Sequence, residues 1–289
     1  MTLELTEVAT VTQRLAVLLA AGVAPPSAWE HVAVDSDAAR RVAEGARMED
    51  QGEPGLQRDA WRGLAAAWSV AMESGSPLAP ALRGYAASLR ELGETQRDAR
   101  VALAGPVATA RLVMALPAVG ILFGLALGFN TLATLFGTPV GWLCLVVGGG
   151  LMLLASRWNG RLVRAARPTS ATPGLACELM AIAMAGGTSL DRAREIVQGA
   201  LTRFGVAAET GHIDSVLDLS RRAGVPAAEL LRSEARELRA TARAQGQERA
   251  AALSVRLMLP LGVCVLPAFL MVGVLPLLVT VVSSTVSSF

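Results

Sequence analysis

Three long apolar stretches without a charged side chain place the strongest constraint on the fold. They cover residues 112–129, 139–156 and 257–282, which are 18, 18 and 26 residues long. A helix needs about 20 apolar residues to cross the hydrocarbon core of a bilayer. Hydrophobic residues make up 53% of the chain, more than soluble proteins of this length usually contain. We therefore predict an all-α membrane protein with three transmembrane helices at these positions.

Arginine residues lie on one side of each predicted span. The loop at 130–138 and the tail after residue 282 carry no charge. Positively charged loops stay in the cytoplasm, so we predict a protein of the cytoplasmic (inner) membrane with a cytoplasmic N-terminus and an external C-terminus. The arginines that set this orientation precede the first span, follow the second and precede the third: Arg97, Arg100, Arg111, Arg157, Arg161, Arg164, Arg167, Arg249 and Arg256.

The predicted spans divide the chain into four parts. Residues 1–111 form a first cytoplasmic helical module, and residues 112–156 form a transmembrane hairpin whose external loop is 130–138. Residues 157–256 form a second cytoplasmic helical module. Residues 257–289 form the third transmembrane helix and a short external tail. Alanine dominates the two modules and alternating β-branched residues are absent, which favours helices.

The two modules repeat one sequence pattern. The stretch AMESGSPLAPALRGYAASLRELGETQRDAR begins at Ala71, and SRRAGVPAAELLRSEARELRATARAQGQER begins at Ser220. In each, a glycine (Gly75 or Gly224) stands two residues before a proline, and a long Ala-, Leu-, Arg- and Glu-rich helix follows. Each of these helices leads into an apolar segment. We therefore expect each copy to be the cytoplasmic stem of a membrane span.

The repeat extends upstream to a shared start. LAVLLAAGVAPPSAWE matches MAIAMAGGTSLDRARE at a fixed offset, which aligns Gly22 with Gly187. Glycine suits the left-handed residue that ends a helix, and Ser27 or Ser189 can cap the helix that follows. The first copy is longer between its glycines, and we expect the polar, turn-rich stretch 44–59 to be an inserted loop.

Each predicted stem has an apolar stripe that favours packing in a helical bundle. The stripes consist of Leu78, Leu82, Ala86 and Leu89 in the first stem and of Leu231, Ala235, Leu238 and Ala242 in the second. The second stem also aligns Arg232, Arg236, Arg239 and Arg243. Arg232 can reach Glu229, but the other three are expected to repel one another more than they pair. This row is either a solvated face or a docking face for an acidic partner or anionic headgroups.

Reactive groups of the common enzyme classes are missing from the sequence. The chain has no lysine, and its histidines, His31 and His212, lack metal-ligand spacing. Nucleotide-binding, hydrolase and metalloprotease motifs do not occur. The three cysteines have no paired spacing, and a net charge of +2 does not suggest nucleic-acid binding. We therefore predict no enzymatic activity, no catalytic residue, no cofactor, no metal and no nucleic-acid partner.

Two further features have a structural and a functional interpretation. Glu73, in MESGSPL, is either a polar contact at a helix end or a ligand of functional importance. The GGG sequence at 148–150 lies inside the second apolar stretch and indicates helix packing or flexibility. The spans contain no Asp, Glu, Lys, Arg or His, which argues against ion-coupled transport.

The chain resembles the type II secretion system F (GspF-like) family of inner-membrane platform proteins. LLAAGVAPPSA and AMAGGTSLDRA are similar to the family's start, and ESGSPLAPAL is similar to its E-x-G-x-x-L-x-x-x-L turn. The motif positions carried over from this resemblance are Gly22, Glu73, Gly75, Leu78, Leu82, Gly187 and Gly224. Arg222 stands where the first copy has Glu73, which departs from the pattern. Within the family, the short length and ALAGPVATARLVMALP look most like the TadB/TadC proteins of the tight-adherence (Flp) pilus.

The resemblance implies a non-enzymatic platform of a type IV (Tad/Flp) pilus or type II secretion machine. Such a platform docks a cytoplasmic assembly ATPase and couples its motion to pilin extraction and filament assembly. The partners it implies are that ATPase, a paralogous F-family platform protein, prepilin subunits and membrane lipids, in a homo- or hetero-oligomer. The alternatives are a small membrane transporter or channel subunit, or a membrane-bound regulator.

Overall fold

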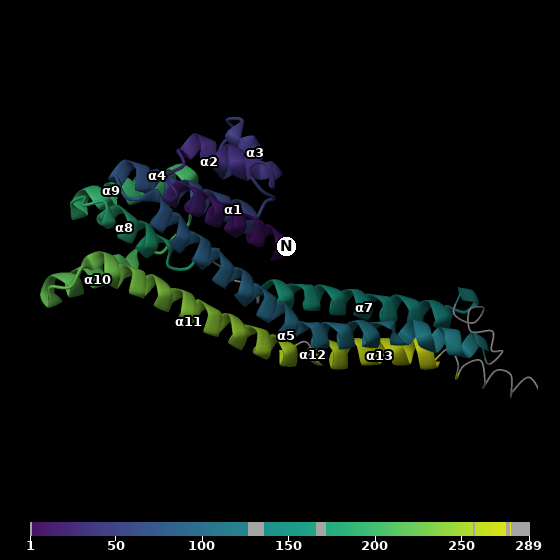
Figure 1. Cartoon of the computed structure of the whole chain (residues 1–289). Helices are drawn as coiled ribbons and strands as arrows, with labels where there is room; N and C mark the ends of the chain where they lie inside the picture. The colour runs from purple at the N-terminus through teal and green to yellow at the C-terminus, as the bar shows by residue number, and fades with distance from the viewer. Residues whose placement is uncertain (1, 127–135, 166–171, 257, 276–277, 279–289) are drawn as a thin grey trace, which may run out of the picture. The chain divides into compact units, whose positions relative to one another are not determined.

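The computed structural model describes residues 2–126, 136–165, 172–256, 258–275 and 278, and every regular element in them is helical (Figure 1). The all-α prediction is confirmed for these residues. The first elements are α1 (Thr2–Ala20), α2 (Pro25–Val32), α3 (Asp37–Ala43), the 3-10 helix η1 (Met48–Asp50), α4 (Leu56–Ser74), α5 (Leu78–Ala126), α7 (Pro139–Ala165) and α8 (Leu175–Ala185). The remaining elements are α9 (Leu190–Phe204), α10 (Gly211–Ala223), α11 (Ala227–Arg256), α12 (Met258–Pro260), the π-helix η2 (Leu261–Val265), α13 (Leu266–Phe269) and the π-helix η3 (Leu270–Val274).

The chain divides into two compact units that each draw on two separated stretches. Unit 1 consists of Met1–Asp98 and Pro168–Gln245, and unit 2 consists of Ala99–Arg167 and Gly246–Phe289. Residues from both predicted cytoplasmic modules therefore lie in unit 1. The long helices α5 and α11 each contribute residues to both units.

Unit 1 has one apolar core that is shared by both halves of the sequence repeat. Trp61 and Leu82 come from the first half, and Met180 and Leu231 come from the second; all four are fully buried in the same cluster. Most of the predicted apolar stripes lie in this core or against it. Leu82, Leu89, Leu231 and Ala235 are in the core, and Leu78 and Leu238 pack against it. Ala86 is buried outside this cluster, and Ala242 is only half-buried. Neither half has a separate core among the described residues. The two copies of the sequence pattern therefore fold together into one unit.

Helix α8 explains why the two halves share a core. Its sequence, LACELMAIAMA, is apolar around its whole circumference, and nine of its 11 residues are buried. A helix of this kind must be surrounded by others, and at 11 residues it is too short to cross a bilayer. Helix α4 covers it from the first half of the repeat, and α9 and α10 cover it from the second.

Close polar contacts also join the two halves of unit 1. The Ser76 hydroxyl donates a 2.6 Å hydrogen bond to the carbonyl oxygen of Ile182 in α8. At Gly186 a β-carbon would overlap the backbone of Ser74, so only glycine allows this approach. The turn after α8 therefore packs directly against the turn after α4.

The predicted insertion at 44–59 is ordered around two buried amides. The Gln51 side chain accepts a 2.8 Å hydrogen bond from Arg41 Nε and donates one to the carbonyl of Arg47. The Gln57 side chain accepts from the backbone N–H of Glu53 and donates to Glu7. The segment is polar as predicted, but these inward-facing amides and η1 give it a defined structure.

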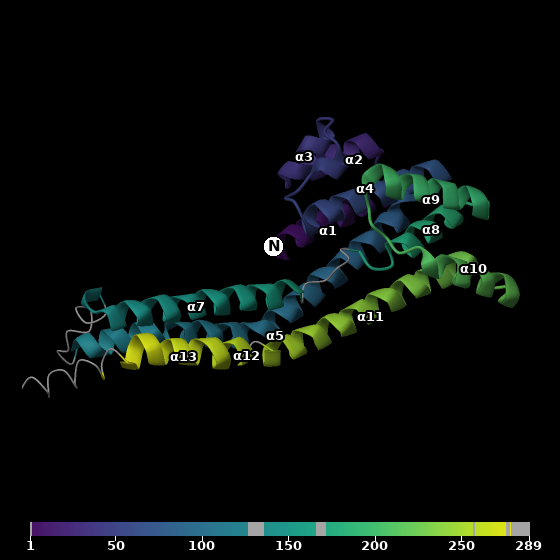
Figure 2. The ribbon, with the colours of Figure 1, turned by 180° about the vertical axis from the view of Figure 1, so that it is seen from behind.

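Unit 2 consists of helices that run side by side (Figures 1 and 2). The last part of α5 meets η3, where a β-carbon on Gly120 would lie 3.3 Å from Gly273 Cα. A β-carbon on Gly148 of α7 would overlap the side chain of Val272, whereas Gly149 and Gly150 face open space. The packing role predicted for the GGG sequence therefore belongs to Gly148.

The outward surface of unit 2 is apolar. Phe123 of α5, Leu143 and Val146 of α7, and Val263 and Leu266 near α13 are all more than half exposed. Soluble monomers do not display apolar surface on every helix of a bundle. This surface fits contact with lipid, and together with the length of the apolar helices it indicates a membrane protein.

Two helical stretches in the described residues are long and apolar enough to cross a membrane, namely Gly141–Leu162 and Ala227–Val274. The first lies on the predicted span 139–156, and the second contains most of the predicted span 257–282. The predicted span 112–129 is helical up to Ala126 but is not one of the two candidates, and its last three residues lie outside the described residues. The three-span topology therefore stays a prediction.

The last apolar helix changes its winding twice. The π-helices η2 and η3 lie on either side of α13. Pro260 ends α12, and Pro267 is the second residue of α13. Proline cannot donate a backbone hydrogen bond, and π-type turns are a common accommodation to a locally disrupted helix. The changes in winding therefore coincide with Pro260 and Pro267.

Candidate functional site

The two turns that the sequence repeat predicts have the same geometry. Helix α4 ends at Gly75 with φ 72°, and α10 ends at Gly224 with φ 68°. Both residues are in the left-handed conformation that closes a helix and favours glycine. Beyond the proline, Leu82 is fully buried and Leu78 packs against the same core. The repeated motif therefore fixes the start of both long helices.

The upstream starts of the repeat differ in their caps. Gly22 after α1 and Gly187 after α8 both have positive φ, near 87° and 80°. Ser189 caps α9 by accepting a hydrogen bond from the backbone N–H of Arg192. The capping role considered for Ser27 is wrong, because α2 begins at Pro25 and Ala24 occupies its N-cap without a side-chain bond.

Glu73 lies at the C-terminal end of α4 and faces a residue from the other half of the repeat. Its carboxylate lies 3.3 Å from Arg203 Nη1 and accepts a 2.9 Å hydrogen bond from the Ser69 hydroxyl. In the second copy, Arg222 pairs with Asp218 on its own helix. Glu73 therefore links α4 to α9, whereas Arg222, at the matching position of the second copy, pairs within its own helix.

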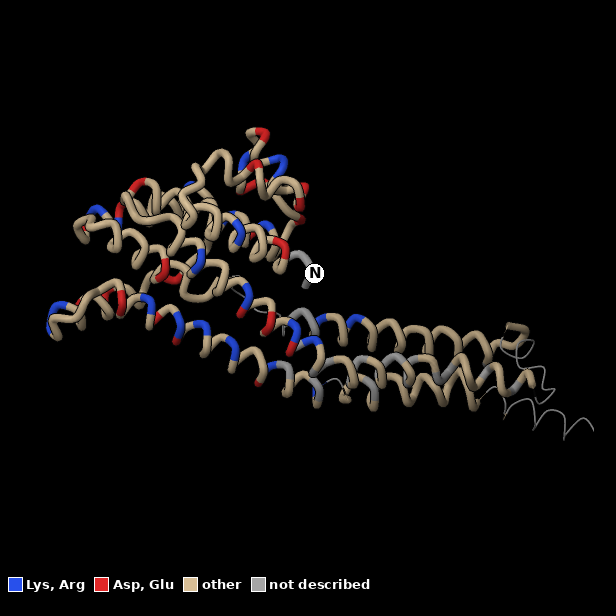
Figure 3. Tube along the Cα trace, viewed as in Figure 1, with Lys and Arg blue, Asp and Glu red and all other residues tan. Residues whose placement is uncertain are grey.

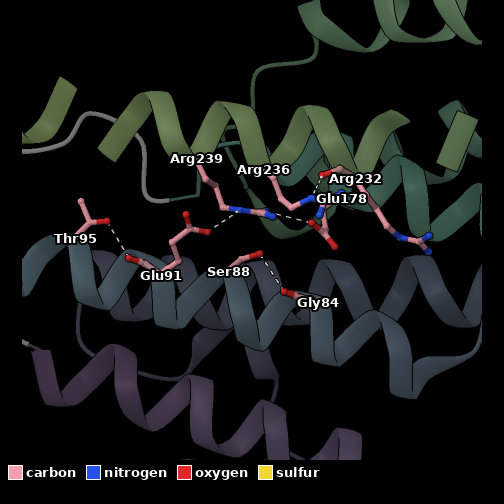
Figure 4. Close-up of polar contacts among 8 residues, drawn as sticks. All are labelled: Gly84, Ser88, Glu91, Thr95, Glu178, Arg232, Arg236 and Arg239. Atoms are coloured by element: carbon pink, nitrogen blue, oxygen red, sulfur yellow. Dashed lines mark hydrogen bonds and ion pairs between the residues drawn. The ribbon is translucent and has the colours of Figure 1, made fainter. Parts of the chain in front are cut away.

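Arg239 joins α11 to α5 and α8 (Figure 4). Its Nη1 donates a 3.2 Å hydrogen bond to Glu178 of α8, and its Nε lies 3.3 Å from a carboxylate oxygen of Glu91 on α5 without hydrogen-bond alignment. The side chains of Arg239 and Glu178 are only 13% and 9% exposed. At Gly84 of α5 a β-carbon would lie 2.7 Å from Glu178 Oε1, so glycine makes room for this carboxylate.

Arg243 makes a second link one turn further along α11. Its Nη2 lies 2.8 Å from Asp98 on α5, with both side chains partly exposed. The expectation that Arg236, Arg239 and Arg243 repel one another more than they pair is therefore wrong for Arg239 and Arg243. Their partners come from other helices, so spacing along α11 could not reveal them.

The remaining two arginines of the row, Arg232 and Arg236, reach no carboxylate of another helix among the described residues, and we call them the outward arginines. Arg232 pairs with Glu229 at 3.0 Å, as predicted, and is partly exposed. Arg236 is exposed and donates a 3.3 Å hydrogen bond to the backbone carbonyl of Arg232. Of the four predicted docking residues, Arg232 and Arg236 are the two without a charged partner on another helix among the described residues.

Sequence reasoning missed the acidic partners of Arg239 and Arg243, which are Glu178, Glu91 and Asp98. Glu178 stands alone in the apolar sequence of α8, which was a usable sign, because an unpaired buried carboxylate is costly. The unusual feature at Gly84, a glycine inside a helix, was a second sign.

The thiol of Cys177, next to Glu178 in α8, has low reactivity. Burial raises the pKa of Cys177 to about 11; the carboxylates of Glu234 and Glu178 raise this pKa further, and Arg239 opposes them. A thiol with a raised pKa is a poor nucleophile and a poor metal ligand at neutral pH. Within the described part of the chain no group of three His, Cys, Asp or Glu side chains could hold a metal ion.

Unit 1 is thus a helical domain whose two halves are joined by packed turns and by ion pairs. Residues 11–126 match the family of type II secretion system (T2SS) protein F. The match covers all of the first sequence copy, from α1 into the apolar part of α5.

The family match supports the resemblance seen in the sequence motifs. Proteins of the T2SS protein F family are structural platform proteins, and such a domain indicates a role in a secretion or pilus platform. No curated protein and no solved structure matches the chain.

Proposed function

We propose that this protein is a non-enzymatic inner-membrane platform of a type IV (Tad/Flp) pilus or type II secretion machine. It docks a cytoplasmic assembly ATPase on unit 1 and couples the motion of that ATPase to pilin extraction. The match of residues 11–126 to T2SS protein F is the observation that carries the proposal. The sequence motifs that resemble TadB and TadC favour the tight-adherence pilus over other machines.

The helix arrangement in unit 1 supports a role in transmitting motion. Helices α5 and α11 are linked by the ion pairs Arg239–Glu91 and Arg243–Asp98. Each of these helices also contributes residues to unit 2, which is the apolar unit. A displacement of unit 1 by a partner would therefore act on both long helices together.

We place the ATPase contact at the outward arginines of α11. Arg232 and Arg236 have no charged partner on another helix in the described structure, whereas Arg239 and Arg243 are paired with carboxylates of other helices. Guanidinium groups at a protein interface favour an acidic partner surface and accelerate association. The other proposed partners are a paralogous F-family protein, prepilin subunits and lipids, with the N-terminus cytoplasmic and the C-terminus outside.

The docking surface is tested by replacing both outward arginines. The double variant Arg232→Gln/Arg236→Gln is expected to fold normally, to lose most of the co-purifying ATPase, and to reduce pilus assembly or secretion. Loss of two interfacial charges affects mainly the association rate and its salt dependence. Co-purification at low and high salt, with filament counts on cells, measures both effects.

A matched control is available on α10. Arg221 and Arg222 are adjacent and exposed, and Arg221→Gln/Arg222→Gln removes the same charge from unit 1. This control is expected to retain the ATPase. Equal ATPase recovery and equal piliation in the two double variants would show that the α11 arginines are an ordinary solvated face.

A further inference from the structure

Unit 2 carries almost only positive charge, and that charge lies outside the apolar stretches. The residues of unit 2 include eight arginines and one acidic residue, Glu248. The apolar stretches themselves have no charged residue, and most of the length of α7 is accordingly tan in Figure 3. All eight arginines precede 112–129, follow 139–156 or precede 257–282. An anionic ligand therefore meets little competition from carboxylates of this unit.

Helix α7 presents two of these arginines on the same face as lipid-exposed leucine. Leu153, Arg157 and Arg161 are spaced four residues apart, so they form one row along the helix. Leu153 is 60% exposed and both arginines are exposed. Ala155 and Asn159, which are buried, lie on the opposite face. The row therefore changes from apolar to basic within one helical turn.

Two tryptophans mark the ends of the apolar part of α7. Trp142 and Trp158 are 16 residues apart, or about 24 Å along the helix axis. Both rings are partly exposed. Tryptophan is enriched at the two membrane–water interfaces, so Trp158 places Arg157 and Arg161 at headgroup depth. The residues next to Trp142 carry no charge.

Neither Arg157 nor Arg161 is bound to another group among the described residues. In the described residues, Arg157 and Arg161 make no hydrogen bond or ion pair, whereas Arg239 and Arg243 of unit 1 have carboxylate partners. Exposed guanidinium groups one turn apart suit bidentate binding of phosphate.

We propose that Arg157 and Arg161 bind the phosphate of an anionic phospholipid whose acyl chain lies along Leu153. The lipid belongs to the leaflet at which the C-terminal end of α7 emerges. Such a site anchors α7 at a fixed depth and enriches anionic lipid around its C-terminal end. This surface is separate from the outward arginines of α11 and does not depend on the proposed platform function.

Quenching of tryptophan fluorescence by brominated lipids tests the proposal on the full chain in vesicles. Trp142→Phe leaves Trp158 as the tryptophan of α7, and Trp158→Phe leaves Trp142. Brominated phosphatidylglycerol is expected to quench Trp158 several-fold more effectively than brominated phosphatidylcholine. Trp142 is expected to respond equally to both lipids, because its end of α7 has no arginine.

Replacement of the two arginines completes the test. In the Trp142→Phe background, Arg157→Gln/Arg161→Gln is expected to bring the preference of Trp158 for anionic lipid down to about one. Arg221→Gln/Arg222→Gln in unit 1 is the control and is expected to keep the preference. Quenching of Trp142 by phosphatidylcholine in an otherwise matched variant confirms that the altered chain inserts.

Two results would overturn the proposal. One is an equal preference for anionic lipid at Trp158 with and without the two arginines. The other is loss of the preference when inorganic phosphate replaces chloride at constant ionic strength, which would identify the ligand as free phosphate instead of a lipid.

Discussion

At the scale of single residues, Arg239 joins three helices of unit 1. Its guanidinium group reaches carboxylates on two other helices and is largely buried with one of them. Removing one partner of a buried ion pair leaves an uncompensated charge, which costs far more than the loss of an exposed pair. Arg239 and Arg243 differ in burial but lie on the same helix, so they form a natural comparison.

We predict that Arg239→Met lowers the free energy of unfolding of unit 1 by about 3 kcal/mol. Arg243→Met, whose ion pair is partly exposed, is expected to cost less than about 1 kcal/mol. Chemical unfolding of the detergent-solubilised protein, followed by far-ultraviolet circular dichroism, measures both. Equal losses in the two variants would contradict the assignment of Glu178 as a buried carboxylate that depends on Arg239.

A second prediction at this scale concerns Cys177. Its pKa of about 11, against an ordinary value near 9, means that the folded protein has about one hundredth of the usual thiolate at pH 8. In a Cys144→Ala/Cys264→Ala background, maleimide is expected to label the unfolded chain quickly and the native chain very slowly. The native rate should still be rising at pH 10; a plateau near pH 9 would show an ordinary thiol.

At the scale of the elements, the sequence predicts most of the helices because their signals are local. Gly75 and Gly224 close their helices next to a proline, and the apolar stripes identify the buried faces. The shared core could not be predicted in the same way. It depends on contacts such as Ser76 to Ile182, which are 106 residues apart. The partners of Arg239 were missed for the same reason.

The packing of α7 gives a prediction for the GGG sequence. Gly148→Leu is expected to lower the thermal stability of unit 2 clearly, because its β-carbon would overlap Val272. Gly150→Leu adds the same side chain on the same helix where nothing lies within 4 Å. This control is expected to be neutral or stabilising, since leucine favours a helix more than glycine does. The melting temperature in detergent separates the two, and equal values would contradict the observed packing.

At the scale of the whole molecule, the fold combines an interlocked helical unit with an apolar helical unit. The sequence predicted the membrane character, and the structure adds that both long helices supply residues to both units. The proposed platform function rests on the match of residues 11–126 to T2SS protein F.

The most direct test of this account is purification of the tagged protein from its native membrane in mild detergent, with identification of its partners by mass spectrometry. We predict recovery of a secretion-type assembly ATPase, with or without a second protein of the F family. Recovery of a solute-binding or signalling protein in place of the ATPase would contradict the platform function. It would mean that the F-family domain serves a different role in this chain.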